Sequence, residues 1–540
     1  MFRKMALFFC TMILLMPYFL SPVIMESGIA SAENDSLKTF TNTVDGYSIA
    51  LPADLQQNMD NSSVSAIFER DDMKIEVFKQ YVGDIGSRAY INYSNAFLRN
   101  DMDHVLDKRF YTTIDGHEAN VLLWHREKLS RVNNDRNYYL NLEIPSGAYV
   151  YSFFVKSDKP MWEQGDYMSW FNTFKIIKTT EEGTLHKTRI PKDFKDNWND
   201  ETRKFYRQYF SERNPLSWGI FQPDTDTGEF GMLKYYEDFF EYDFPVILSY
   251  SHFNDGTHSK LTSRLTDAYK HGKVVELALQ TTAATDGGNM MYDILNGEYD
   301  YFLEDYAKQI ADFSHPVLFR LFNEMNGDWC TYCAYHYSKD TDLFIETYKY
   351  IYGIFERSGA NKNTIWVWNP NGDSLPAFKW NHYSKYYPGD EYVQIVGMTA
   401  YNTGVYYSSI GERWKEFSEL YDGLYNEYAG RFAQPLMITE FASANAGGDK
   451  AAWIARMGEK IVNYKQIKMA VWWDGQDWDA DGNVARSYII NENQDTMAAF
   501  KKVLKESTND PNSWKKNIYA ALSDRNKILS AHLDRNGEVN

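Results

Sequence analysis

The sequence has few cysteines and no surplus of positive charge. Only three of its 540 residues are cysteine, which excludes a small scaffold held together by disulfides. Lysine and arginine number 56 against 74 aspartates and glutamates, a formal net charge of −18 that would repel phosphate backbones. Nucleic acid is therefore not expected as a partner. After the first 25 residues the sequence has no run long and apolar enough to cross a bilayer.

What the chain does have is length and aromatic side chains. Its 540 residues allow two to four domains with a sizeable core. Hydrophobic residues make up 44 % and charged residues 24 %, proportions that are typical of a globular protein. The 41 tyrosines, 33 phenylalanines and 15 tryptophans exceed ordinary usage. Most of them should fill the core, but a share could line a site for the flat apolar faces of sugars.

The N-terminus has the pattern of a secretory signal. Arg3 and Lys4 precede an apolar run from Met5 to Met25, and Ala30-Ser31-Ala32 offers small residues for cleavage. An uncleaved membrane anchor is the alternative, because the run is longer than a usual signal core. Two prolines within the run favour a signal peptide that is cleaved and removed. We therefore expect residues 1–32 to be a signal peptide and the protein to be secreted, extracellularly or to the cell surface.

The cysteines in the expected mature protein are Cys330 and Cys333, since Cys10 lies inside the apolar run. In an oxidising compartment their Cys-x-x-Cys spacing predicts a short local disulfide. A redox role would need a thioredoxin-like context, and a zinc site would need two further ligands. We expect no metal and no cofactor.

Residues 33–178 alternate strand-like runs with turn signals. Asp45-Gly46, Asp115-Gly116 and Ser146-Gly147 are typical of hairpins or tight turns, and two further stretches, 87–100 and 161–174, have helical spacing. The pattern predicts a smaller antiparallel α+β domain. It gathers no carboxylates, histidines or glycines as catalysis would require. We expect it to be dispensable for bond cleavage and to serve docking, substrate capture or association with a cell wall or cell surface.

The rest of the chain reads as a linker, a barrel and a tail. Residues 179–214 are polar and lead into a helix, and residues 506–540 are predicted to be a charged helical tail. Between them, residues 215–505 show short apolar runs separated by helix-length stretches, which is typical of βα units. The eight runs lie at 218–221, 246–250, 274–279, 317–322, 364–368, 395–399, 436–439 and 470–473. Eight units predict an α/β fold, a (β/α)8 TIM barrel with its active site at the carboxyl ends of the strands.

Two glutamates stand at carboxyl ends of predicted strands. Glu324 follows the fourth run and Glu440 follows the seventh. A lone glutamate in such a place is more often a capping or ion-pairing group. Glycosidic cleavage needs a pair, in which one carboxyl protonates the leaving oxygen and the other attacks the anomeric carbon or activates water. The pair, together with aromatic residues at neighbouring strand ends, favours catalysis.

Five segments together resemble, in order and spacing, the motifs of glycoside hydrolase family 26, the β-mannanase-type endo-hydrolases of clan A of retaining (β/α)8 enzymes. They are FRLFNEMNGDW, WVWNPNGD, YYPGDEYVQIVGMTAYN, PLMITEFAS and IKMAVWWDGQDW. The resemblance implies that Glu324 is the general acid/base and Glu440 the nucleophile. It also implies that Tyr401 hydrogen-bonds the nucleophile and that Arg320 supports the catalytic carboxylates through charge-assisted bonds.

The same resemblance implies an aromatic floor for the cleaved-sugar subsite, formed by Trp472 or Trp473. Trp329, at the end of the first motif, is a further candidate for substrate contact. Family 26 usually has histidine directly before the acid/base, whereas this chain has Asn323, as in other members of the clan, where that residue contacts the 2-hydroxyl of the sugar. Mannan is the first choice of substrate, with β-glucan, xylan or a bacterial exopolysaccharide as alternatives.

Two other groups of residues could be read as metal sites. His252 and His258 follow the second run, but no carboxylate partner is evident, and a rim histidine that contacts sugar is preferred. The segment 477–482 matches the start of a calcium loop, yet Tyr488 stands where a bidentate glutamate belongs, so a polar rim loop is preferred. Together the residues predict a secreted, monomeric, retaining endo-β-glycosidase acting on a polysaccharide. The competing hypothesis is a non-catalytic carbohydrate-binding barrel.

Overall fold

The computed structural model describes residues 36–100, 102–192, 197–253, 257–281, 289–507, 518–519 and 523. The predicted signal peptide and nearly all of the predicted C-terminal tail lie outside these residues. From Leu37 onward the described residues belong to one compact unit. No helix among them is long and apolar enough to cross a membrane.

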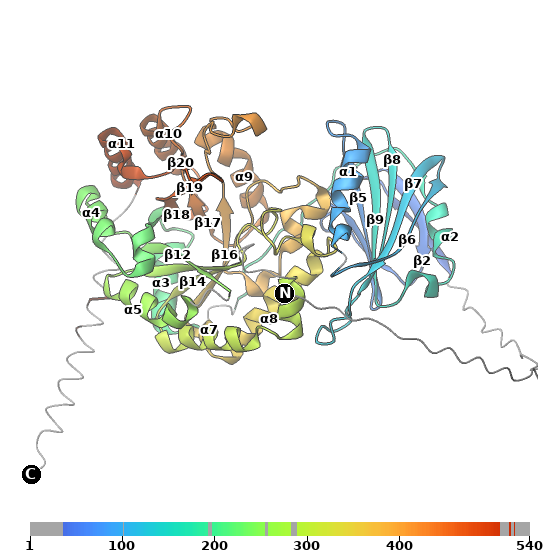
Figure 1. The fold of residues 1–540 in the computed structure, drawn as a ribbon, viewed down its shortest axis with the longest axis horizontal. Helices are drawn as coiled ribbons and strands as arrows, with labels where there is room; N and C mark the ends of the chain where they lie inside the picture. Colours follow the sequence, from blue (N-terminus) through green and yellow to red (C-terminus); the bar gives the residue numbers. More distant parts are fainter. Residues whose placement is uncertain are drawn as a thin grey trace, which may run out of the picture. The chain divides into compact units, whose positions relative to one another are not determined.

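The N-terminal part contains two antiparallel sheets (Figure 1), and we call residues 37–176 the sheet region. The smaller sheet has the order β1-β2-β10, with bounds Leu37–Asn42, Tyr47–Pro52 and Lys175–Ile176. The larger sheet has the order β3-β4-β5-β9-β8-β7-β6, with bounds Gln56–Asn58, Ala66–Arg70, Met73–Tyr81, Tyr149–Ser157, Tyr138–Ser146, His117–His125 and Val105–Ile114. The helices of the sheet region are α1 (Ser87–Ser94), α2 (Tyr167–Asn172) and the short 3-10 turns η1 (Ala96–Arg99) and η2 (Met161–Glu163). The predicted antiparallel α+β fold is confirmed.

The three predicted turns each join a pair of adjacent antiparallel strands. Asp45-Gly46 links β1 to β2, Asp115-Gly116 links β6 to β7, and Ser146-Gly147 links β8 to β9. The glycines of these turns have φ of 74°, 79° and 59°, a left-handed conformation that a side chain disfavours. Glycine therefore sets the place where each hairpin reverses.

The larger sheet is buried on both faces. Side chains alternate along β7, so that Val121 and Leu123 pack with the small sheet and α2, while Leu122 and Trp124 point to the other face. That second face packs against α1 and also against Trp380, which comes from the C-terminal part of the chain. The sheet region is thus packed against the barrel through an apolar face as well as through polar contacts.

The C-terminal part is a closed barrel of eight parallel strands in sequence order, β11 to β18 (Figure 1), which confirms the predicted TIM barrel. The strands are Ser217–Phe221, Val246–His252, Val274–Gln280, Val317–Leu321, Thr364–Trp368, Ile395–Thr399, Leu436–Phe441 and Ile467–Trp473. All eight predicted runs fall on these strands, because parallel strands buried on both faces are continuously apolar.

Helices cover the outside of the barrel. An entry helix, α3, spans Asp200–Phe210, and the helices that follow are α4 (Gly231–Phe240), α5 (Leu261–Lys270), α6 (Met290–Asn296), α7 (Asp300–Phe313), α8 (Thr341–Arg357), α9 (Phe417–Arg431), α10 (Lys450–Ile461) and α11 (Gln494–Ser507). Between β15 and β16 the described chain forms only short 3-10 turns, among them η7 (Lys379–Asn381) and η8 (Tyr383–Tyr386). A hairpin of β19 (Gln476–Trp478) and β20 (Val484–Ser487) follows β18 at the catalytic end.

Candidate active site

A cleft of about 1000 Å³ opens at the carboxyl ends of the barrel strands. Both predicted catalytic glutamates line it, Glu324 after β14 and Glu440 on β17. Its other lining residues include aromatic side chains from several strand ends, namely Phe221, Tyr250, Trp329, Tyr332, Tyr401, Trp473, Trp478 and Tyr488. An open cleft walled by aromatic rings and carrying two carboxylates suits a polar polymer that has flat apolar faces.

Glu440 is nearly buried and held by two donors. The hydroxyl of Tyr250, on β12, donates to its Oε2, and the Arg320 guanidinium lies 3.3 Å from the same oxygen. Arg320 is completely buried and also contacts Glu276 at 3.1 Å and the side-chain oxygen of Asn369 at 3.0 Å. One carboxylate oxygen of Glu440 is thereby fixed in place by a phenol and a guanidinium.

Glu324 leaves the barrel at a sharp turn of the backbone. Phe322 and Glu324 have φ of 50° and 59°, and the Glu324 amide donates to the carbonyl of Asn369 at 2.7 Å. Burial raises the pKa of Glu324 to about 8, and the negative charge of Glu440 adds to this rise, while Arg320 and Trp329 oppose it. A carboxyl group that keeps its proton near neutral pH can act as a general acid.

Sequence reasoning did not single out Glu276. It lies on β13, completely buried inside the barrel, and burial raises its pKa to about 8 although Arg320 acts in the opposite direction. The available signal was a single charged residue in the otherwise apolar run 274–279. Glu276 sets the position of Arg320, which in turn contacts the nucleophile candidate.

The hydrogen bond predicted for Tyr401 is made by Tyr250 instead. Tyr401 lines the cleft and packs near Trp473 and Tyr488, with ring centroids 6.3 and 5.2 Å apart, but within the described residues it makes no hydrogen bond to Glu440. Both tyrosines stand at the carboxyl end of a strand. Their reach toward Glu440 depends on how far each strand extends, which the sequence does not show.

The two candidate tryptophans of β18 point in opposite directions. Trp473 lines the cleft and stacks on Phe221, with ring centroids 5.3 Å apart. Trp472 is completely buried among Phe441, Trp453 and Phe500, between the strand and the helices outside it. Successive side chains of a strand alternate, so only Trp473 can serve as an aromatic floor.

The predicted disulfide is wrong, because both Cys330 and Cys333 are free thiols. Each sulfur is directed to its own partner. The Cys330 thiol donates to the Asn323 carbonyl at 3.8 Å, and the Cys333 thiol donates to the Asn381 side chain at 3.5 Å. The two-residue spacing belongs to a tight turn, in which the Cys333 amide donates to the carbonyl of Cys330.

The remaining predicted contact residues also line the cleft. Trp329 is 50 % exposed, Asn323 is buried, and His252 lies 3.1 Å from the side-chain nitrogen of Gln280. The side chain of His258 lies outside the described residues, so the proposed histidine pair cannot be placed. Asn323, His252 and Trp329 thus join the two glutamates at one site.

The calcium-like segment forms the β19–β20 hairpin. Asp479 accepts hydrogen bonds from the amides of Asp481 and Asn483, and Asp477 pairs with Arg486 at 2.8 Å. Arg486 also pairs with Glu412 and lines the cleft. Within the described ranges no group of three histidine, cysteine, aspartate or glutamate side chains is placed to hold a metal ion. The segment 477–482 thus lies in a polar hairpin whose residue Asp477 lines the cleft.

A parallel (β/α)8 barrel with two glutamates in one cleft at the carboxyl ends of its strands is the arrangement of many glycoside hydrolases. Residues 251–453, which lie within the barrel, match the model of glycosyl hydrolase family 26, and this match supports the assignment of the barrel to that family.

Curated relatives agree with this assignment. Endoglucanase H of Acetivibrio thermocellus is 29 % identical over 222 residues, which is 41 % of this chain and 23 % of that protein. A mannan endo-1,4-beta-mannosidase of Bacillus subtilis is 28 % identical over 253 residues, 42 % of this chain and 64 % of that protein. The match thus spans less than two thirds of either relative's length.

Solved structures of similar proteins include mannanases. A Bacillus subtilis mannanase covers 59 % of this chain and 94 % of its own, with 17 % identity and a TM-score of 0.41. A modular endo-beta-1,4-mannanase from Cellulomonas fimi covers 57 % of this chain and 75 % of its own, with 15 % identity and a TM-score of 0.43. The barrel topology of this protein rests on its own strand pairing.

Proposed function

We propose that the barrel is a retaining endo-β-glycosidase that hydrolyses a mannan-type polysaccharide by double displacement. The observation that carries this proposal is the contrast between two carboxyl groups in one cleft. Burial and a neighbouring charge raise the pKa of Glu324 to about 8, whereas Glu440 is fixed by Tyr250 and Arg320. Two glutamates in different environments can take the two roles that the reaction needs.

In the first step Glu440 attacks the anomeric carbon while Glu324 gives its proton to the leaving glycosidic oxygen. A covalent glycosyl-enzyme results, and the leaving chain departs as an alcohol. In the second step the deprotonated Glu324 takes a proton from water as the water attacks the same carbon and releases Glu440. Arg320 keeps positive charge beside Glu440 throughout both steps.

The choice of a mannan-type polymer rests on the family and on the names of the relatives, two of which are mannan endo-1,4-beta-mannosidases of Bacillus subtilis. The open, aromatic cleft favours attack within a chain over removal of terminal sugars. Asn323 is expected to contact the 2-hydroxyl of the sugar at the cleavage site. β-Glucan is the second candidate, because a further relative carries the name endoglucanase.

The test is release of reducing ends from mannans, mixed-linkage β-glucans, xylans and bacterial exopolysaccharides by the purified protein. We expect release from mannan, with a first-formed product of retained configuration by NMR. Glu440→Ala should lower turnover by several orders of magnitude, and azide should restore part of it with inverted product. Binding without cleavage across the panel, or inverted product from the unmutated protein, would contradict the proposal.

Secretion belongs to the same proposal, because a polymer substrate lies outside the cell. The basic pair, apolar run and Ala-x-Ala site at the N-terminus support it. We expect protein recovered from the medium of the producing cells to begin at Glu33. Mass spectrometry of the N-terminal peptide checks this, and a secreted or membrane-bound protein that retains residues 1–32 would contradict cleavage.

A further inference from the structure

The connection that carries Glu324 is in contact with the sheet region along much of its length. This β14–α8 connection spans residues 322–340 and also supplies Trp329 to the cleft. Near the catalytic residue, the hydroxyl of Tyr93 on α1 donates to Asp328. The rings of Tyr93 and Tyr335 stack with their centroids 5.0 Å apart. Only three residues lie between Glu324 and Asp328, the first of these contacts.

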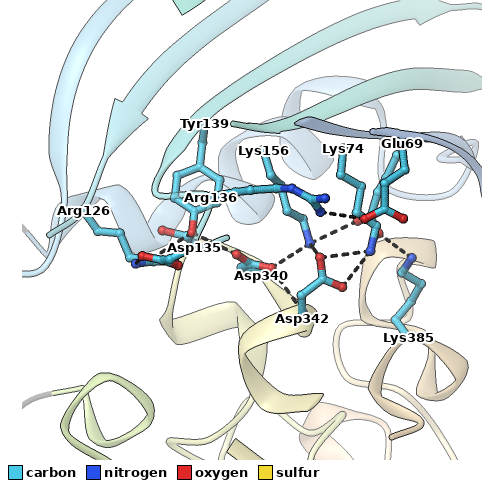
Figure 2. Close-up of polar contacts among 12 residues, drawn as sticks. Glu69, Lys74, Arg126, Asp135, Arg136, Tyr139, Lys156, Asp340, Asp342 and Lys385 are labelled. Carbon is cyan, nitrogen blue, oxygen red and sulfur yellow. Dashed lines mark hydrogen bonds and ion pairs between the residues drawn. The ribbon is translucent and has the colours of Figure 1, made fainter. Parts of the chain in front are cut away.

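A cluster of charged side chains joins the far end of the connection to the sheet, and Figure 2 shows most of its members. On the barrel side, Asp340 and Asp342 stand at the start of α8. Lys156 of β9 lies 2.6 Å from Asp340 and 2.8 Å from Asp342, and Lys74 of β5 lies 2.7 Å from Asp342. The hydroxyl of Tyr139 donates to the second oxygen of Asp340 at 2.9 Å.

The cluster is balanced in charge, and all of its members except the partly exposed Asp342 are buried. Lys156 is 1 % exposed and Asp340 3 % exposed, so each would be costly to leave without its partner. Glu76 completes the set by accepting from Lys385 of η8 at 2.7 Å. Three lysines and three carboxylates thus meet across the boundary between sheet and barrel, with both signs supplied from both sides.

The turn just before α8 has a backbone conformation that needs external support. Ser338 and Lys339 have φ of 62° and 57°, left-handed values that residues other than glycine rarely adopt. The indole of Trp124 on β7 donates to the Ser338 hydroxyl at 3.1 Å, and Lys339 donates to the Asn95 side chain at 3.1 Å. Donors and acceptors of the sheet region therefore hold this turn.

Hydrogen bonds within the connection carry this support back to the catalytic end. The hydroxyl of Tyr337 donates to the carbonyl of Tyr332 at 2.9 Å, and the hydroxyl of Tyr332 donates to the carbonyl of Asn323 at 2.7 Å. Asn323 directly precedes Glu324. All three residues are buried, so the connection behaves as one packed piece.

The connection between β15 and β16, residues 369–394, is tied to the same sheet. The Trp380 indole donates to Ser94 at 3.2 Å, and the Lys379 amide donates to the Gln80 side chain at 2.8 Å. This connection contributes Leu375 to the cleft wall, and the Leu375 carbonyl accepts from the amide of Asp328 at 2.9 Å. The β14–α8 and β15–β16 connections, which both line the cleft, are thus both held by the sheet region.

We infer that the sheet region is a positioning element of the active site, which holds the β14–α8 connection and with it the proton donor Glu324. This inference rests on the proposed function, and it replaces the expectation that the N-terminal part is dispensable for bond cleavage. None of the described residues of the sheet region lines the cleft, so its role is to position and not to react.

The experiment uses single substitutions in the full chain. Tyr93→Phe removes one hydrogen bond to Asp328 and keeps the ring stack, and Lys156→Gln removes the central lysine of the cluster. Tyr111→Phe is the matched control, because it removes a phenol bonded at 3.0 Å to Arg109 within the sheet region. Each variant is assayed on polymer and on an aryl glycoside whose leaving group needs little protonation.

A misplaced proton donor slows only the substrate that needs a proton. We expect Tyr93→Phe to lower kcat on polymer about tenfold while the aryl glycoside rate changes less than about twofold, with a larger difference for Lys156→Gln. Tyr111→Phe should leave both rates unchanged. Equal losses on both substrates, or no loss in either variant, would overturn the inference.

Amide hydrogen exchange tests the same idea without reference to activity. Peptides from residues 323–341 should exchange faster in Tyr93→Phe and Lys156→Gln than in the unmutated protein, while peptides from β13 and β17 stay unchanged. Unchanged exchange in 323–341 overturns the inference. If exchange rises there but the unmutated protein cleaves no glycan, the positioning role stands and the proposed function falls.

Discussion

Two glutamates of one cleft differ in what surrounds each carboxyl group. Glu440 contacts a phenol and a buried guanidinium, so its charge is compensated where it stands. Glu324 is half-buried beside that charge, and its own countercharge, Arg320, is directed to Glu440 and Glu276. In the proposed mechanism, the difference between the nucleophile and the proton donor is therefore set by neighbouring side chains on β12, β13 and β14.

The pH dependence of activity should report Glu324. It must carry a proton to act on polymer, and its raised pKa means that the proton is lost as pH rises through about 8. We expect kcat/KM on polymer to fall on the alkaline side with an apparent pKa near 8. An aryl glycoside with an activated leaving group should show little of this fall. An alkaline limb that lies near pH 5 on polymer would contradict the assignment.

Substitution of the two tyrosines should separate their roles. Tyr250→Phe removes the hydrogen bond to Glu440, and bonds to charged groups contribute about 1.5 to 3 kcal/mol, so kcat should fall at least about tenfold. Tyr401→Phe keeps the ring that packs near Trp473 and should have a smaller effect. Steady-state kinetics on the same polymer compares them. A larger loss for Tyr401→Phe would restore the role that the sequence motif implied.

At the level of elements, the barrel could be read from the sequence and the site only in part. Each strand is a short apolar run whose own residues reveal it, and Glu324 and Glu440 follow two of these runs directly. The side chains that contact these two glutamates could not be predicted from the apolar runs. Whether Tyr250 or Tyr401 reaches Glu440 depends on strand ends that differ by one or two residues, since β12 extends to His252 and β16 ends at Thr399.

Contacts between elements distant in sequence could be predicted even less from local sequence patterns. Lys156 and Asp340 are 184 residues apart, and the sequence around either residue does not indicate that the two side chains pair. The Cys-x-x-Cys spacing fits a disulfide and a tight turn equally well, and only the directions of the two sulfurs decide between them. Side-chain direction and long-range pairing are properties of the folded chain, so local patterns do not contain them.

The alternation along β18 predicts opposite consequences for two adjacent tryptophans. Trp472→Ala should destabilise the fold by about 3 to 5 kcal/mol, because it empties a space among buried aromatic rings. Trp473→Ala should leave stability nearly unchanged and raise KM on oligosaccharides. Thermal unfolding and steady-state kinetics of both variants check this. A raised KM for Trp472→Ala at unchanged stability would mean that the two side chains had been assigned to the wrong faces.

For the whole molecule, the boundary between sheet and barrel is a charged contact inside one compact unit. Burial alone would raise the pKa of Glu76 and of Asp342, but the neighbouring lysines outweigh it, lower the pKa of Glu76 to about 2 and hold that of Asp342 well below its usual range. Carboxyl groups with lowered pKa values stabilise the fold above their ordinary titration range, and that stability is lost as pH falls through the folded values. Glu143, whose pKa burial raises, acts in the opposite direction.

Acid should therefore weaken this boundary before it unfolds the barrel. We expect one calorimetric transition at neutral pH, and separate transitions of the sheet region and the barrel as pH falls below about 4. Tyr111→Phe, which leaves the boundary intact, should behave as the unmutated protein. In Lys156→Gln, which already lacks the central lysine, the separation should appear nearer to neutrality. A single transition over the whole range in all three proteins would contradict this view.

The ion pairs across the boundary between sheet region and barrel also restrict how the two parts of the protein can evolve. Lys74, Glu76 and Lys156 come from the sheet region, and Asp340, Asp342 and Lys385 come from the barrel, so each set finds its opposite charges in the other. A recombination event that joined this barrel to a foreign N-terminal segment would leave the buried Asp340 and the partly buried Asp342 without cations. The two halves of the gene should therefore descend together, with changes on one side followed by changes on the other.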